Sequence, residues 1–225
     1  MAFALVQTGT AGGGTGSVSV TLSSTGVNNL LVVAIIVQGT IDSLLTLTDN
    51  QSNTYEIQSY VQAGFRIYQC YGVQITSGTT SITATFSGSS NTHRIQASEF
   101  SGFGAGATNA TVYDNTSTGI GPAGSSATAL VAAFSPSASG NLVVASYTLE
   151  NQASVPGWVA GTNYTLAFDV LRVFGQVYRL SSGTSETAPA SVAVHPAGVR
   201  WCGRAISFKV PTPVATPRSY GFIIG

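Results

Sequence analysis

Six short sequence patterns occur twice in this 225-residue chain, in the same order and offset by 105 to 112 residues. One pair consists of the run that starts at Asn29 (NLLVVA) and the run that starts at Asn141 (NLVVA), which are 112 residues apart. A single match of this length arises easily by chance, whereas six matches in a conserved order indicate a duplicated unit. We therefore expect two sequence-related halves, at about residues 18–104 and 127–209.

Within each half the sequence favours short β-strands. Residues 80–86 alternate, with Ile82, Ala84 and Phe86 on one predicted face and hydroxyl residues on the other, which is the pattern of a half-buried strand. Residues 30–37 are all apolar and fit a fully buried strand. No segment shows a convincing helical period. We expect an all-β, antiparallel β-sandwich built from the two sequence-related halves, with about seven strands per half.

Three segments fall outside this pattern. Residues 1–17 are rich in glycine and predict a flexible N-terminal segment, and residues 101–126 predict a long loop between the halves. Residues 210–225 carry three prolines and predict an extended C-terminal arm. This arm either folds back on its own sandwich or adds to a neighbouring subunit. Its candidate partner-binding residues are the apolar ones near its end, namely Tyr220, Phe222, Ile223 and Ile224.

Charge is unusually scarce. Charged residues make up 7% of the chain, and eight basic and eight acidic side chains give a net charge of zero. Without a basic patch, nucleic-acid binding is disfavoured. A surface covered by hydroxyl and amide groups lacks the repulsion that keeps monomers apart, so a homo-oligomer is expected. No apolar run is long enough for a membrane span, and the first residues lack a secretory signal.

We find no pattern that predicts catalysis, a cofactor or a metal site. His93 and His195 have no adjoining nucleophile motif, and the eight acidic residues are scattered. Residues 49–53 (DNQSN) fail the calcium-loop pattern and predict an Asx-type turn. Cys70 and Cys202 are expected to be buried free thiols, although a disulfide is not excluded by sequence. Trp158 follows Pro-Gly and is a possible glycan contact, with core packing as the alternative.

Six segments follow the pattern of a known module. They are residues 30–34 (LLVVA), 46–49 (TLTD), 53–55 (NTY), 67–68 (IY), 83–87 (TATFS) and 99–102 (EFSG). Together they resemble the jelly-roll-like β-sandwich module of bacterial surface proteins and of structural proteins of tailed phages, including decoration or cement proteins. The likeness extends over residues 18–209, with Phe100 where the module usually has tyrosine, and the second half lacks the aspartate turn. The resemblance implies a jelly-roll-like fold and no catalytic residues. Because both halves tend to occur together in such modules, one sandwich built from both halves is favoured, and two consecutive small sandwiches remain an alternative.

These features lead to a prediction of a non-enzymatic virion structural protein. The resemblance and the low charge favour a phage capsid decoration protein that stabilises the shell by contacts between subunits. Its expected partners are the major capsid protein or other virion subunits, and its expected location is the virion, assembled in the host cytoplasm. The alternative is a carbohydrate-binding or adhesive module on an extracellular surface.

Overall fold

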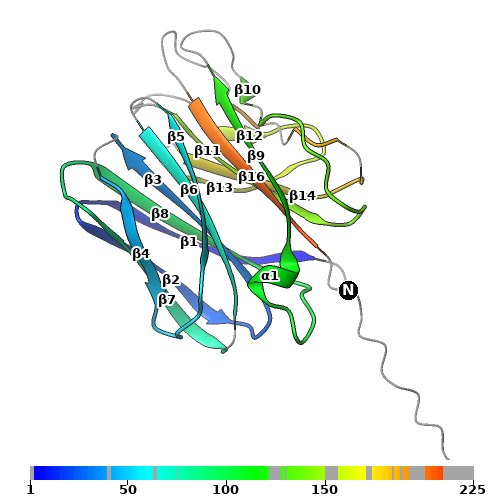
Figure 1. Cartoon of the computed structure of the whole chain (residues 1–225), viewed down its shortest axis with the longest axis horizontal. Coiled ribbons are helices and arrows are strands. Elements are labelled where there is room, and N and C mark those ends of the chain that lie inside the picture. The colour runs from blue at the N-terminus through cyan, green and yellow to red at the C-terminus, as the bar shows by residue number, and fades with distance from the viewer. Residues whose placement is uncertain are drawn as a thin grey trace, which may run out of the picture.

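The computed structural model describes residues 3–39, 42–62, 65–74, 76–121, 128–129, 131–149, 157–170, 174–183, 185–187, 190–192 and 201–209. These residues form an all-β protein with four antiparallel sheets and one four-residue helix, α1 (Asn109–Val112). No helix among them is long and apolar enough to cross a membrane. Figure 1 shows the sheets stacked in layers, from β2, β4 and β7 on one side to β10 and β12 on the other.

The first half contributes eight strands in two sheets. A five-stranded sheet has the order β1-β8-β3-β6-β5, and a three-stranded sheet has the order β2-β7-β4. The strands are β1 (Ala4–Gly14), β2 (Ser17–Thr25), β3 (Leu30–Gln38), β4 (Leu44–Asp49), β5 (Glu56–Gln62), β6 (Phe65–Val73), β7 (Gly78–Phe86) and β8 (Thr92–Ser101). With strands 1, 8, 3 and 6 in one sheet and 2, 7 and 4 in the other, this is the order of an eight-stranded jelly roll in which β5 has moved to the edge beside β6.

The second half repeats this topology. Its sheets have the orders β9-β16-β11-β14-β13 and β10-β15-β12, so each strand number exceeds its counterpart by eight. The strands are β9 (Tyr113–Gly121), β10 (Thr128–Ala129), β11 (Leu142–Leu149), β12 (Trp158–Ala160), β13 (Thr165–Val170), β14 (Phe174–Leu180), β15 (Ala190–Val192) and β16 (Trp201–Phe208). The topology is duplicated, whereas a common sequence ancestor of the two halves stays a prediction.

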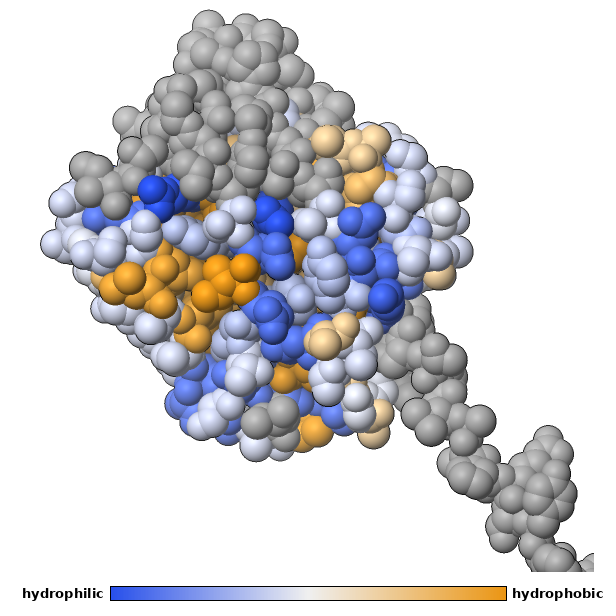
Figure 2. All heavy atoms as spheres, in the orientation of Figure 1, coloured by the Kyte–Doolittle hydropathy of each residue, from blue (hydrophilic) through white to orange (hydrophobic). Residues whose placement is uncertain are grey.

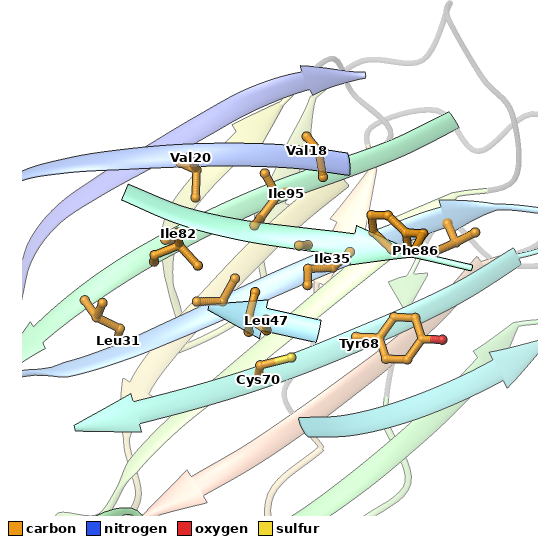
Figure 3. Close-up of a cluster of buried hydrophobic side chains, with 14 of the residues drawn as sticks. Val18, Val20, Leu31, Ile35, Leu47, Tyr68, Cys70, Ile82, Phe86 and Ile95 are labelled. Atoms are coloured by element: carbon orange, nitrogen blue, oxygen red, sulfur yellow. The ribbon is translucent and has the colours of Figure 1, made fainter. Parts of the chain in front are cut away.

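Each half closes its own sandwich, so the expectation of one sandwich built from both halves is wrong. In the first half, side chains of β2, β4 and β7 pack onto the inner face of the five-stranded sheet (Figure 3). In the second half, Trp158 and Ala129 pack onto β11 and β16 in the same way. The two sandwiches meet through the opposite faces of their five-stranded sheets, where Leu30 and Val32 contact Leu142 and Val144 in one cluster. Strand β3 is therefore buried on both faces, which explains its uninterrupted apolar run.

A polar row runs through the middle of this interface. On one sheet Gln96 and Gln69 flank Ala34, and on the other Arg204 and Gln176 flank Ser146. These rows lie at corresponding positions of the repeated topology. They connect across the interface, because the Gln69 amide donates to the carbonyl of Val144 at 3.0 Å and the Ser98 hydroxyl donates to Gln176 at 2.6 Å. Such directional bonds fix the register of two otherwise apolar faces.

Two segments that sequence reasoning placed outside the sandwich belong to it. Most of the glycine-rich N-terminal segment is β1, an edge strand paired with β8. Its glycines allow close approach, since a Cβ on Gly9 would lie 2.8 Å from the backbone oxygen of Thr21. The expected loop at residues 101–126 contains α1 and the edge strand β9. Both strands consist largely of small and polar residues, because an edge strand needs backbone pairing more than apolar side chains.

Candidate functional site

The outer face of the β2-β7-β4 sheet carries an array of hydroxyl groups. Three cross-strand rows follow from the register of the sheet. Eight of the nine residues in these rows are serine or threonine, and the ninth is Asn50, at the end of one row. The rows are Ser17-Thr85-Thr46, Ser19-Thr83-Thr48 and Thr21-Ser81-Asn50, and we call these nine residues the hydroxyl array. The other side of the same strands is apolar, with Val20 and Ile82 in the sandwich core, so strand alternation directs every hydroxyl outward.

The hydroxyl array is open and only partly bonded to itself. Ser19 and Thr83 share a hydrogen bond of 2.7 Å between their hydroxyl oxygens. The hydroxyls of Thr46, Thr48 and Thr85 are exposed and make no hydrogen bond within the described part of the chain. Neighbouring rows lie about 6.8 Å apart along a strand and neighbouring strands about 4.8 Å apart. The array is therefore a regular lattice of groups that both donate and accept hydrogen bonds.

The three strands that carry the array are nearly uncharged. In Figure 2, pale residues of intermediate hydropathy cover much of the described surface, with clusters of hydrophilic residues and patches of hydrophobic ones among them. Leu45, at the start of β4, is 60% exposed. Asp49 is the one acidic residue on β2, β4 or β7, and none of these strands carries a basic residue. It is turned away from the array, toward the turn that follows β4.

Asp49 organises that turn with all of its acceptor capacity. One carboxylate oxygen accepts from the backbone N–H groups of Gln51 and Asn53, at 2.9 and 3.0 Å. The other accepts from the Asn53 amide and the Tyr55 hydroxyl, both at 2.7 Å. Burial, reinforced by Asp49, raises the pKa of Tyr55 far above its usual value. The predicted Asx-type turn is confirmed.

The buried pair Asp42 and His93 is the one place where an imidazole meets a carboxylate among the described residues. His93 Nε2 lies 3.2 Å from Asp42 Oδ2, and both side chains are at most 2% exposed. The imidazole stacks on Phe86 with 3.7 Å between ring centroids, and Asp42 accepts from the backbone N–H of Asn91 at 3.0 Å. Burial lowers the pKa of His93. Enclosed in this way, the pair ties the segment before β4 to the start of β8.

Trp158, the possible glycan contact, is 3% exposed and belongs to the core of the second sandwich. Its ring stacks on Tyr147 with centroids 5.7 Å apart and covers Gly175, where a Cβ would lie 2.5 Å from the indole. Its position fits the core-packing alternative, because neither face of the ring is open to a sugar. The arm residues Tyr220, Phe222, Ile223 and Ile224, and also His195, lie outside the described residues.

Cys70 and Cys202 are both free and buried, as the sequence predicted. Cys70 points into the core of the first sandwich, whereas Cys202 contacts Ile67 between the two sandwiches. Burial raises the pKa of both thiols above the usual value. Within the described residues, no group of three or more His, Cys, Asp or Glu side chains is placed to hold a metal ion.

A shallow cleft of about 280 Å³ lies beside α1. Glu56 is its one charged lining residue, and the Asn109 amide at its edge is already engaged. Asn109 accepts from the backbone N–H of Val73 at 2.8 Å and donates to the carbonyl of Thr54 at 2.9 Å. The cleft thus offers one carboxylate, whereas the hydroxyl array offers a repeated set of groups.

Comparison with known proteins found no matching family model, no similar curated protein and no similar solved structure. The functional argument therefore rests on the chain itself. Sequence reasoning missed the hydroxyl array because its three strands are not consecutive in the chain. The signal was present in each strand, as S-V-S-V-T-L-S from residue 17, T-L-T from residue 46 and S-I-T-A-T-F from residue 81.

Proposed function

We propose that this chain is a non-catalytic structural protein of a virus particle, and that it decorates a capsid through contacts with neighbouring subunits. The observation that carries the proposal is a stack of four β-layers in a chain with very few charged residues. Interface centres are depleted of charge, and a chain with 7% charged residues has little repulsion between copies.

The stack is suited to a mechanical role. Both five-stranded sheets are buried on two faces, and the polar row fixes their register. The Glu99 carboxylate stabilises the first sandwich, because it accepts hydrogen bonds from Gly26, Asn29 and Gln7 at 2.6–2.7 Å. A rigid unit loses little entropy when it docks, so each small contact retains more of its free energy. Many copies on one shell then add their contacts.

The C-terminal arm is the second part of the proposal. In a decorated shell, the apolar residues of the arm would add to a neighbouring subunit. Deletion of residues 211–225 should abolish assembly while leaving the cooperative unfolding of the sandwiches unchanged. Assembly that persists in the truncated protein would remove the arm from the proposal.

The direct test is to locate the chain in its native source. Particles are separated on a density gradient, and the chain is detected by mass spectrometry and by immunogold labelling in negative-stain images. We expect it in the particle fraction, with gold at regular positions on the shell. A chain found only in the soluble fraction, with bare particles, would overturn the proposal.

The second candidate function is adhesion to carbohydrate. With Trp158 buried, the feature that favours it is the hydroxyl array, because a neutral lattice of donors and acceptors complements a sugar polymer. This candidate does not compete with the first, because a chain held on a shell through its C-terminal arm would leave the hydroxyl array open.

A further inference from the structure

We propose that the hydroxyl array is an adhesion face for neutral, ordered polysaccharide. The inference rests on the proposed function in one respect: it needs many copies held in an array. The occupant is identified by three properties of the face, namely its charge, its size and the type of its polar groups.

Charge complementarity excludes most other partners. The array contains eight hydroxyl residues and one amide, and no cation that would pair with phosphate, sulfate or carboxylate. Nucleic acids, anionic lipids and acidic glycans all need such cations. It also has no Trp, Tyr or Arg, the residues that anchor most protein–protein contacts. A neutral polymer rich in hydroxyl groups is the partner that leaves no charge unpaired on either side.

The size of the face argues for repeated weak contacts. Three strands about 4.8 Å apart and three rows about 6.8 Å apart cover about 300 Å². A stable protein interface buries about 800 Å² on each partner. One copy therefore binds weakly, and useful affinity requires an extended surface that many copies contact at once. An ordered polysaccharide provides that surface, whereas a single short oligosaccharide does not.

The polar groups supply the recognition chemistry. Ser and Thr hydroxyls rotate to donate or accept as the partner requires. Thr46, Thr48 and Thr85 have hydroxyls that the described part of the chain does not use, so they are available to a ligand. The threonine methyl groups add apolar contact between the rows, which suits the C–H faces of a sugar ring. Repetition in two directions favours an ordered polymer over an isolated sugar.

The test uses the full-length protein displayed at high density on beads, so that avidity does not depend on any native particle. Beads are incubated with insoluble neutral polysaccharides (cellulose, chitin and granular starch) and with calcium alginate as an acidic comparison. We expect retention on at least one neutral polymer and none on alginate. Retention on alginate alone, or on no polymer, would overturn the inference.

A shape-matched variant locates the contact. Thr46→Val, Thr48→Val and Thr85→Val together remove the three exposed hydroxyls that the described part of the chain does not use, and they keep the β-branched shape. With three hydrogen bonds lost per copy, bead retention should fall to about one tenth or less. The matched control is Thr165→Val, an exposed threonine on β13 of the other sandwich, which should bind as the wild type does. Equal retention of the triple variant and the wild type would overturn the inference.

A second variant covers the case in which the triple variant folds poorly. Thr48→Lys places a charge on the edge strand of the array, where Thr48 is exposed, and should also reduce retention. Circular dichroism and thermal melting confirm folding of each variant. If polysaccharide binding fails while the chain is still found on particles, the adhesion inference falls and the proposed structural function stands.

Discussion

Gln96 is a buried polar residue in the interface between the two sandwiches, and no hydrogen bond within the described part of the chain offsets the free-energy cost of burying its amide. The side chain is fully buried, and neither its Nε2 nor its Oε1 finds a hydrogen-bond partner among the described residues. Each buried polar group left unsatisfied costs about 1–3 kcal/mol. Gln96→Met keeps the length of the side chain and removes both groups, so their sum, about 2–6 kcal/mol, is an upper bound on the gain.

We expect Gln96→Met to raise the free energy of unfolding by about 1–3 kcal/mol, because a buried amide recovers part of its cost by relaxing toward polar neighbours. For a chain of this size, each kcal/mol corresponds to about 2–4 °C in Tm. Urea denaturation followed by tryptophan fluorescence measures the change, and an unaltered m-value shows that the same cooperative unit unfolds.

Gln176→Met is the matched control in the facing sheet. Gln176 is equally buried, but it accepts from Ser98 at 2.6 Å and donates to Ser146 at 3.0 Å. Removing this amide deprives the buried hydroxyls of Ser98 and Ser146 of a hydrogen-bond partner. The free energy of unfolding should therefore fall by about 1–3 kcal/mol. The same chemical change is thus expected to have opposite signs at two positions of one interface. A loss of stability in Gln96→Met as large as that in Gln176→Met would refute the reasoning.

Three further predictions concern the pH dependence, the aromatic core and the thiols. Because burial lowers the pKa of His93, the unfolded state takes up its proton first as pH falls through about 6.5, and stability should decrease between pH 7.5 and 5.5. Burial alone would raise the pKa of Asp42. The hydrogen bonds from Asn91 and the charge of His93 outweigh this effect and hold the pKa below its usual value. A second loss of stability should therefore begin as the pH falls below about 3.8. Urea midpoints across this range should show both steps, and His93→Gln should flatten the upper one. Gly203→Ala should cost about 1–3 kcal/mol in thermal unfolding, because the new Cβ would lie 2.3 Å from the Tyr147 ring, whereas Gly104→Ala, with nothing within 4 Å, should be neutral. Both thiols should resist a thiol-specific reagent until urea unfolds the chain, and fast labelling of Cys70 or Cys202 in the native protein would contradict their burial.

The strands that sequence reasoning located are those with strong side-chain patterns. Residues 80–86 bury Ile82, Ala84 and Phe86 and expose the hydroxyl side, as their alternation predicted. Residues 30–37 form the predicted buried strand. The missed strands, β1 and β9, are edge strands defined by backbone pairing, and their glycines and threonines are typical of loops as well. Strands β10, β12 and β15 have two or three residues each, too few to show any period.

The site was harder to predict than the fold, because it depends on register between distant segments. The pairing of Ser19 with Thr83 and of Thr83 with Thr48 links three strands that are up to 64 residues apart. Nothing in the local sequence indicates which hydroxyl faces which. Trp158 illustrates the converse: a tryptophan after Pro-Gly has the local sequence of an exposed loop, yet it covers Gly175, a contact that only the tertiary fold creates.

The way the two sandwiches combine determines which surface is available to a partner. Their five-stranded sheets cover each other, so the broad outer faces left are those of the two three-stranded sheets. In the second sandwich that sheet is built from strands of two or three residues, whereas in the first its strands have nine, nine and six. Within the residues that the structure describes, the duplicated topology therefore presents one extended face, that of the first sandwich. For this reason we place contact with a partner on the first sandwich, and we expect exposed substitutions there to alter adhesion while comparable ones on β13 leave it unchanged.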